Sequence, residues 1–461
     1  MKPILSLVTL LLVISTVQAQ SFVGYRSGNY AGVNGVFFNP SYAANSRYHW
    51  DLNLVQVNAS VYNDAAKYKL NSFTKNFNSD EILNKLYGSQ NANALVNVDV
   101  LGPSLLFSIN SKTAFAFTTR YRVFGNLRNV DGTLLQAIEG DDAPAAFNVS
   151  NSNMQVAATA WAEAGVTWAN EIYKSDHHFL KGGITLKYLG GISNASISTH
   201  NLNASITQDV SKDSYFAGNA SGDINLLFAG TSPSNISGSD LTKFKGSGAG
   251  MDIGLSYEYR PNSEEYKRPD GSYDRSANLY KVKASVALLD LGSIRFTPDG
   301  ERSGNYTAGI TGSNEFDLSA LNTDIDNIKT AFDANPALFT PAATSTGKYK
   351  VSLPASLMAE VDYHFSKGLY LNVASHLALA KSNDLYKMST LNSFIATPRL
   401  ETQFIGIYVP LQVNDMTGFD AGAAIRFGKL VVGSSNIFTA LGGSKMVNAY
   451  VGIRLLGSMI K

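Results

Sequence analysis

A strict alternation of apolar and polar residues runs from residue 349 to residue 365. The apolar positions are Tyr349, Val351, Leu353, Ala355, Leu357, Ala359, Val361, Tyr363 and Phe365. Period-two alternation predicts a β-strand with one apolar face, and this one is far longer than the usual strand of about 5–6 residues. The middle of the face is aliphatic and its ends are aromatic, which is typical of a strand in a transmembrane β-barrel. At a tilt of about 40°, ten steps along the strand cover about 25 Å of membrane height.

A turn at 366–368 leads into a second alternating stretch at 369–380, so the two stretches predict a hairpin. The alternative is an amphipathic hairpin of a large soluble β-sandwich. Recurrence of the pattern along the chain favours a barrel wall. The further alternating stretches lie at 47–62, 96–109, 113–123, 155–168, 179–190, 251–259, 280–296, 402–411, 419–427, 430–436 and 447–455.

These patterns predict about 13 strands, and the even strand number of such barrels raises the expectation to about 14. The loop lengths conflict with this count. If short turns lie on the periplasmic side and long loops outside, the last strand ends outside, whereas it should end on the periplasmic side, where the first strand begins. A strand is therefore missing from the count, and we expect it within 191–247 or 291–312. The stretch 191–247 is otherwise predicted to be irregular, since it is rich in Ser, Asn and Gly, with room for one or two strands within it.

Three connections carry helical patterns rather than alternation. Short helices are predicted at 79–87 and 134–138, and an apolar stripe within 313–346 predicts a third. The stripe consists of Leu318, Leu321, Ile325, Ile328 and Phe332. The fold class predicted for the chain is all-β: a single transmembrane antiparallel β-barrel of about 14 strands with short helices in its long loops.

The N-terminus has the features of a cleaved secretory signal. Lys2 precedes an apolar run at 4–13, and the small-x-small site at 17–19 predicts cleavage after Ala19. A retained anchor helix is the alternative, although the run is short for a membrane span. We therefore divide the chain into a signal peptide at 1–19, a plug-like segment at 20–46 and an outer-membrane barrel at 47–461. The expected location is the bacterial outer membrane.

Composition narrows the function classes. The net charge of +1 gives no basic field for nucleic acid, and the absence of cysteine removes disulfides, thiol nucleophiles and Cys-zinc sites. The mean hydropathy of −0.05 is too low for a helical membrane protein but suits a barrel with a polar lumen. The sequence contains no phosphate-binding loop, no GxSxG and no HExxH. We expect no cofactor, no metal and no enzymatic activity.

Several ionisable residues fall on the inward face by alternation, and a set of them is predicted to line the lumen. The set is Arg120, Arg122, Glu258, Arg260, Glu360, Asp362, His364, His376, Asp420, Arg426 and Arg454. The arginines are expected to pair with Asp252 and with the set's own carboxylates as a rigid lining. Two alternatives are an anion-selective constriction built by the arginines and an acid–His hydrolase site at 360–364. His177-His178 is expected to be a solvated turn rather than a metal site.

Sequence motifs give the chain a family resemblance. The segment GVNGVFFNPSYAAN at 32–45, with Asn39 and Pro40, resembles the entry of FadL-like hydrophobe-transport barrels. Together with LLDLGSIRF at 288–296, the stretch at 351–365 and the closing pattern at 418–456, it makes the chain similar to an uncharacterised family of Bacteroidota outer-membrane barrels near FadL-like and PorV-like proteins. The resemblance implies a barrel with an N-terminal segment inside it, without an established activity.

Two functions follow from this reading. The first is passive transport of a small hydrophobic molecule, and the alternative is a non-enzymatic structural or partner-binding barrel in secretion or envelope organisation. The expected partners are outer-membrane lipid, a hydrophobic small-molecule ligand, and an envelope or secretion-system protein. No nucleic-acid partner is expected.

Overall fold

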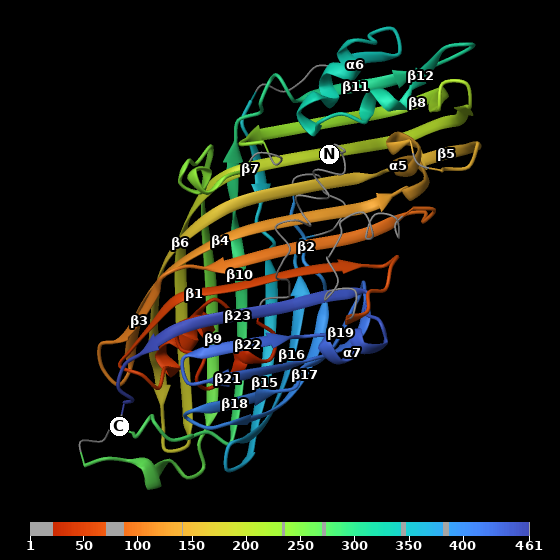
Figure 1. The fold of residues 1–461 in the computed structure, drawn as a ribbon. Helices are drawn as coiled ribbons and strands as arrows, with labels where there is room; N and C mark the ends of the chain where they lie inside the picture. The colour runs from red at the N-terminus through yellow and green to blue at the C-terminus, as the bar shows by residue number, and fades with distance from the viewer. Residues whose placement is uncertain are drawn as a thin grey trace.

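The computed structural model forms one closed antiparallel barrel of 14 strands, which confirms the predicted fold class (Figure 1). The structure describes residues 22–70, 87–140, 142–232, 236–269, 273–342, 347–380 and 387–460. The wall consists, in order, of β1 (Trp50–Asn63), β2 (Ala92–Leu101) with β3 (Ser104–Ser108), β4 (Thr113–Val130), β6 (Gln155–Lys174), β7 (His178–Asp209), β9 (Gly246–Tyr259), β10 (Val282–Phe296), β14 (Tyr349–Ser352) with β15 (Ser356–Ser366), β16 (Leu369–Ala378), β17 (Ser393–Glu401), β18 (Ile405–Tyr408) with β19 (Leu411–Asn414), β20 (Gly418–Ala421) with β21 (Ala423–Phe427), β22 (Leu430–Ser434) and β23 (Met446–Leu456). Pairing of β23 with β1 closes the wall.

Alternation decides which side chains face outward. The outward positions of the wall expose large apolar side chains such as Val166, Leu186 and Ile425, whereas the inward positions are buried and carry most of the wall's charged residues. Exposed aromatic residues, including Phe365 and Phe427, lie near strand ends. Among the described residues no helix is long and apolar enough to cross a membrane.

The stretches 191–247 and 291–312 contain uncounted strands, as expected: β8 (Ser214–Gly230) and β11 (Gly304–Gly309). These lie outside the 14-strand wall, however, and the wall strand missing from the count is β17. Its sequence is SFIATPRLE, and it pairs with β16 on one side and with β18 and β19 on the other. Pro398 argues against a wall strand, because proline cannot donate a hydrogen bond to a neighbouring strand. With β17 included, the strand number is even and the chain returns to the end where β1 begins.

The long alternating stretch at 349–365 is two strands rather than one. The chain leaves the ladder at residues 353–355, beside Pro354, so β14 and β15 pair separately with β10. Val351 and Leu353 are buried in an apolar cluster with Ile294 instead of facing outward. Only the second half of the stretch, through Phe365, carries the outward apolar face. β15 and β16 form the predicted hairpin, with His364 opposite Tyr370.

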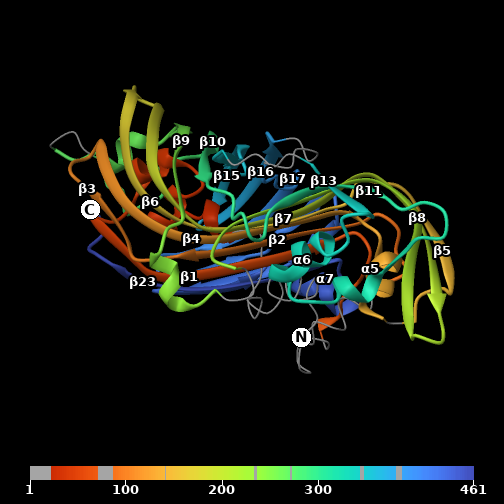
Figure 2. The same cartoon turned by 90° about the horizontal axis from the view of Figure 1, so that it is seen from above.

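A second assembly, which we call the cap, extends the wall at one end (Figures 1 and 2). The stretch 191–247, predicted to be mainly irregular, continues β7 to Asp209 and forms β8, and both belong to the cap. Besides this end of β7, the cap consists of α5 (Gly132–Glu139), β5 (Ala146–Ser152), β8 (Ser214–Gly230), β11 (Gly304–Gly309), β12 (Glu315–Asp317), η6 (Leu318–Leu321), η7 (Ile325–Asn327), α6 (Ile328–Asp333) and β13 (Phe339–Ala342). The predicted stripe helix is therefore three short helical turns. The opposite end, which carries the short turns and the C-terminus, is called the turn end.

The remaining elements are short. The N-terminal segment contains η1 (Tyr25–Ser27), α2 (Val33–Val36) and η2 (Pro40–Asn45), and the connections contain η4 (Gly238–Thr242), η5 (Ser263–Tyr266) and α7 (Ile437–Gly442). The predicted signal at 1–19 and nearly all of the predicted helix at 79–87 lie outside the described residues.

Candidate functional site

The structure places the predicted lumen residues at inward positions of the wall. Nine of them are buried: Arg120, Arg122, Glu258, Arg260, Glu360, Asp362, Asp420, Arg426 and Arg454. His364 and His376 are half-buried. Of the expected charge pairs, only the one between Arg260 and Glu258 forms, with Nε 2.8 Å from the carboxylate.

The arginines on β4 bind carboxylates that the sequence analysis had not selected. Arg120 donates two hydrogen bonds of 2.7 Å to Asp99, and Arg122 contacts Glu163 at 3.2 Å and Asp290 at 2.7 Å. Asp290 reaches them from the far side of the lumen because β10 has a bulge there, where Asp290 adopts a φ of 57°. Lys187 completes this group with contacts of 2.8 Å to Asp290 and to Asp252.

Arg399 on the missed strand β17 forms a second buried group. Its guanidinium binds Asp362 at 2.9 Å and Glu401 at 3.0 Å, and the side chains of all three are fully buried. Asp362 therefore does not pair with one of the expected arginines. Because β17 was not predicted, Arg399 could not be placed on the inward face, whereas Asp99 and Glu163 could have been found by extending the alternation.

The other expected pairs are also replaced. Arg454 binds Asp51 at 2.7 Å, and Arg426 donates to backbone carbonyls of the turn 402–404. Asp420 accepts from Ser444 at 2.6 Å, and Glu360 accepts from Tyr42 of the N-terminal segment. Each of these lumen charges is thus held by a partner within the barrel.

The residues considered for an acid–His site do not form a catalytic arrangement. Asp362 binds Arg399, Glu360 binds Tyr42, and the ring of His364 stacks on Tyr370 at 4.7 Å. His376 lies further along β16 and contacts the carbonyl of Leu391 at 3.0 Å. Within the described part of the chain, no three His, Asp or Glu side chains lie close enough together to hold a metal ion.

The N-terminal segment at 22–46 lies inside the barrel and contacts the wall on several sides. The Phe22 amide donates to Asn58 of β1 at 3.0 Å, and the Asn29 amide donates to Glu401 of β17 at 3.0 Å. On β23, Arg454 donates to the carbonyls of Tyr30 and Ala31. The segment therefore touches strands from the beginning and the end of the wall.

Asn39 and Pro40 sit against a recess in the wall. The Asn39 side chain accepts from the Ser41 amide at 3.0 Å, which caps η2, and donates to carbonyls of β9 and β10. Two paired glycines, Gly183 of β7 and Gly254 of β9, form the recess. A β-carbon on Gly183 would lie 2.5 Å from the carbonyl carbon of Pro40, so this close approach requires glycine.

Small cavities remain between the segment and the wall. Their volumes are about 60, 80 and 10 Å³. A water molecule needs about 10–15 Å³ by the same measure, so each space holds a few waters at most. The described part of the lumen is a packed interior of charged groups and apolar clusters rather than an aqueous channel.

The cap contains a larger cavity of about 140 Å³, which we call the cap cavity. Apart from Ser198 and Thr199, its lining is entirely apolar and comes from α5, the cap-end parts of β4, β6 and β7, the other cap strands and the helical turns that follow β12. All five residues of the predicted apolar stripe line it: Leu318, Leu321, Ile325, Ile328 and Phe332. The stripe was recognised from the sequence, but the strands opposite it were not.

The cap cavity lies outside the wall, not in the lumen. Strand register puts Leu127, Val156, Ile197 and Leu226 side by side across β4, β6, β7 and β8. By alternation along β4 these positions share the outward face with Phe117, which is 52% exposed. The outward apolar face of the barrel thus continues into the cap, where α5 and the helical turns cover it.

A polar contact holds the covering helix in place. Tyr306 of β11 donates to the Asp333 carboxylate of α6 at 2.6 Å, and its ring lies 5.2 Å from that of Phe332. Burial raises the pKa of the Tyr306 phenol, and the hydrogen bond to Asp333 raises it further. The phenol therefore remains a hydrogen-bond donor over the physiological pH range.

Comparison with solved structures finds barrels that overlap most of the chain. The crystal structure of the Ralstonia pickettii toluene transporter TbuX is 9% identical, with 96% of this chain and 100% of that chain covered and a TM-score of 0.46. A Pseudomonas aeruginosa FadL homologue is 11% identical, with coverages of 92% and 93% and a TM-score of 0.39. The Escherichia coli outer-membrane protease OmpT is 7% identical, with coverages of 88% and 95% and a TM-score of 0.21. These values are too low for a function to be carried over.

Among curated proteins, none matches the sequence. A family model does match, and it covers residues 40–435, which is most of the barrel. The match begins at Pro40 and ends within the connection that follows β22. The chain belongs to DUF5723, a family of unknown function.

Proposed function

We propose that this chain is a bacterial outer-membrane barrel for passive transport of a small hydrophobic molecule, which binds first in the cap cavity. The exposed apolar band on the outward faces of the wall supports placement in a bilayer. Short turns in such barrels lie on the periplasmic side, so the turn end would face the periplasm and the cap the exterior. The proposal includes a cleaved signal at 1–19, a plug at 20–46 and a non-enzymatic barrel at 47–461.

The cap cavity is the observation that carries this proposal. Its volume of about 140 Å³ is close to that of an engineered apolar cavity of about 150 Å³ that stays dry and binds benzene in another protein. The lining carries no charged side chain, so a hydrocarbon fits it better than a molecule with an ionised head group. A ligand of about six carbon atoms matches the space.

The position of the cavity also suggests a route. Since its walls continue into the outward apolar face, a bound hydrocarbon can move along that face into the outer leaflet. This path leaves the packed lumen closed. Transport would then consist of capture at the cap and release into lipid.

A filled cavity should abolish binding. Ala217 of β8 lines the cavity and is buried, so Ala217→Phe places a ring in the space without changing charge. Ala164→Phe is the matched control, because Ala164 lies on the exposed outward face of β6. We expect ¹⁹F NMR of hexafluorobenzene with detergent-solubilised protein to show a bound resonance for the native chain and for Ala164→Phe, and at least tenfold weaker binding for Ala217→Phe. Equal binding by all three proteins would contradict the proposal.

The alternative is a structural or partner-binding barrel in secretion or envelope organisation. The packed lumen favours this function, since the N-terminal segment is hydrogen-bonded to the wall inside it. A barrel that only binds partners on its surface needs no open channel. Folded protein that neither binds the hydrocarbon probe nor supports its uptake into cells would favour the alternative.

A further inference from the structure

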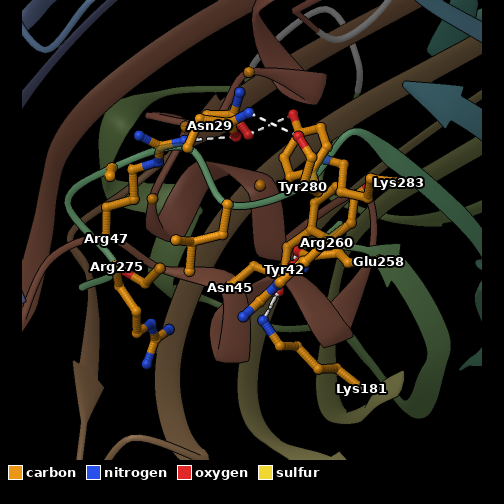
Figure 3. A pocket seen from close by; sticks show the side chains of 18 residues that line it. Asn29, Tyr42, Asn45, Arg47, Lys181, Glu258, Arg260, Arg275, Tyr280 and Lys283 are labelled. Carbon is orange, nitrogen blue, oxygen red and sulfur yellow. Dashed lines mark hydrogen bonds and ion pairs between the residues drawn. The ribbon is translucent and has the colours of Figure 1, made fainter. Parts of the chain in front are cut away.

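The turn end of the lumen contains a cavity of about 60 Å³ with an unusual surplus of positive charge, which we call the basic pocket (Figure 3). It lies between the N-terminal segment, the inward faces of β7, β9 and β10, and the connection 260–281. Five cationic side chains line it: Arg47, Lys181, Arg260, Arg275 and Lys283. Glu258 is the single carboxylate among its lining residues.

That carboxylate is already engaged. Arg260 binds Glu258 through Nε at 2.8 Å, and Lys181 lies 3.8 Å from the other carboxylate oxygen. Lys283 lies 3.9 Å from Asp362, whose two oxygens Arg399 already binds. One lining carboxylate therefore faces five cations, four of which are buried to 6% exposure or less.

The two remaining arginines have only neutral partners among the described residues. Arg47 donates to Tyr30 Oη at 3.1 Å, to the Ser276 carbonyl at 3.0 Å and to Asn278 Oδ1 at 3.2 Å. Arg275 donates to the Ala44 carbonyl at 2.6 Å. Neither guanidinium therefore has a carboxylate within ion-pair distance among the described residues, although Glu401 attracts Arg47, and Glu258 and Glu171 attract Arg275, from farther away.

Clustered buried cations are costly, because each loses hydration and repels the others. The lumen groups around Arg122 and Arg399 avoid this cost by pairing each cation with carboxylates of the chain. In the basic pocket, by contrast, five lining cations outnumber the one lining carboxylate. An anion from outside the chain would balance this surplus, and arginine forks suit tetrahedral and planar oxyanions.

We propose that the basic pocket binds a small, multiply charged oxyanion of the phosphate class. The space is about that of four or five water molecules, which fits one phosphate group. Asn29, Tyr42 and Asn45 also line the pocket, and these neutral side chains add no negative charge to it (Figure 3). The site is independent of the cap cavity, since it lies at the opposite end of the barrel.

Two sources can present a phosphate group at the turn end: a free ion, or the head group of a lipid. Thermal unfolding of the full chain in detergent separates them, with inorganic phosphate as one probe and dihexanoyl phosphatidate as the other, at constant ionic strength. Arg275→Gln tests the site, because Arg275 lies on the connection 260–281 rather than in the wall. Lys243→Gln removes the same charge from an exposed side chain directly after η4 and serves as the control.

We expect inorganic phosphate to raise the unfolding temperature of the native chain and of Lys243→Gln, with an apparent affinity at least tenfold weaker in Arg275→Gln. The same pattern with the phosphatidate but not with inorganic phosphate assigns the pocket to a lipid head group. No effect of either probe on the native chain, or an equal effect on Arg275→Gln, overturns the proposal. Arg47→Lys is a second variant, which keeps the charge but loses the fork and should bind more weakly than the native chain.

Discussion

At the scale of residues, the lumen depends on buried charges that each need their partners. Arg399, Asp362 and Glu401 have no exposed side-chain surface, so none can turn to water if a partner is lost. Removing one member of such a group leaves the others desolvated and unbalanced. Breaking one of these contacts therefore lowers the stability of the fold strongly, even where forming it adds little net free energy.

Arg399→Met tests this dependence. We expect the variant to lose about 3–5 kcal/mol of unfolding free energy, because Asp362 and Glu401 would remain buried beside a neutral side chain. The measurement is the urea midpoint of unfolding in detergent. Lys267→Met, which breaks an exposed pair with Glu264, should leave the midpoint unchanged, and a similar loss in both variants would contradict the argument.

Alternation along a strand predicts the face on which a residue lies, but not its partner across the lumen. Asp290 meets Arg122 only because of a bulge in β10, and the two residues are 168 positions apart. The sequence offers no local signal for that bulge. The pairings expected for the arginines were mostly wrong for this reason, since a partner depends on strand order and tilt as well as on alternation.

At the scale of elements, the strands of the wall can be predicted from the alternation of apolar and polar residues more fully than the elements of the cap. The wall strands alternate small polar and apolar residues, so most were predictable. β17 was missed because of Pro398, and β8 because Ser, Asn and Gly dilute its alternation. The apolar stripe at 318–332 was recognised, but its three short turns follow from packing against the cap sheet rather than from helix propensity.

The link between β10 and the cap gives a pH-dependent prediction. Arg302 binds Asp299 at 2.7 Å and Asp326 of η7 at 3.0 Å. Burial alone would raise the pKa of Asp299, but its hydrogen bonds from Arg302 outweigh burial and lower it. A depressed pKa means that the Asp299–Arg302 pair, which positions Arg302 against Asp326, stabilises the fold above the unfolded-state Asp pKa of about 4 and loses its effect as the pH falls through the lower folded-state value.

We therefore expect the amides of η7 and α6 to exchange hydrogen faster, relative to those of β15, when the pH is lowered from about 6 to about 3. Hydrogen exchange corrected for its intrinsic pH dependence measures this. In Arg302→Gln the two elements should already be less protected at pH 6, and acidification should add little. An unchanged ratio in the native chain would show that the link does not hold the cap.

At the scale of the whole molecule, the N-terminal segment closes the lumen. It binds β1, β17 and β23 as well as the recess on β7 and β9, so it is held at well-separated points around the wall. Spaces beside it have volumes of about 60, 80 and 10 Å³. The folded barrel should consequently be a poor conductor of ions.

Planar-bilayer recordings test this expectation. The native chain should show no steady single-channel current, and deletion of 22–46 should produce steps of constant conductance, because a polar wall would then enclose water. Gly183→Val should give intermittent openings, since the new side chain overlaps Pro40. Gly309→Val is the control, as a β-carbon there meets only open space. Steady currents through the native chain would show that the segment does not seal the lumen.

The contacts of Arg454 also bear on how the barrel assembles. This side chain joins three parts of the molecule: β23, Asp51 of β1 and the backbone at 30–31. β23 is made last, and its pairing with β1 seals the circle. The N-terminal segment is bonded to both of these strands, so it must lie inside the barrel before they pair. It can therefore act as a template around which the barrel closes. In that case the packing of the N-terminal segment inside the lumen, rather than the lipid around the barrel, would fix the number of wall strands.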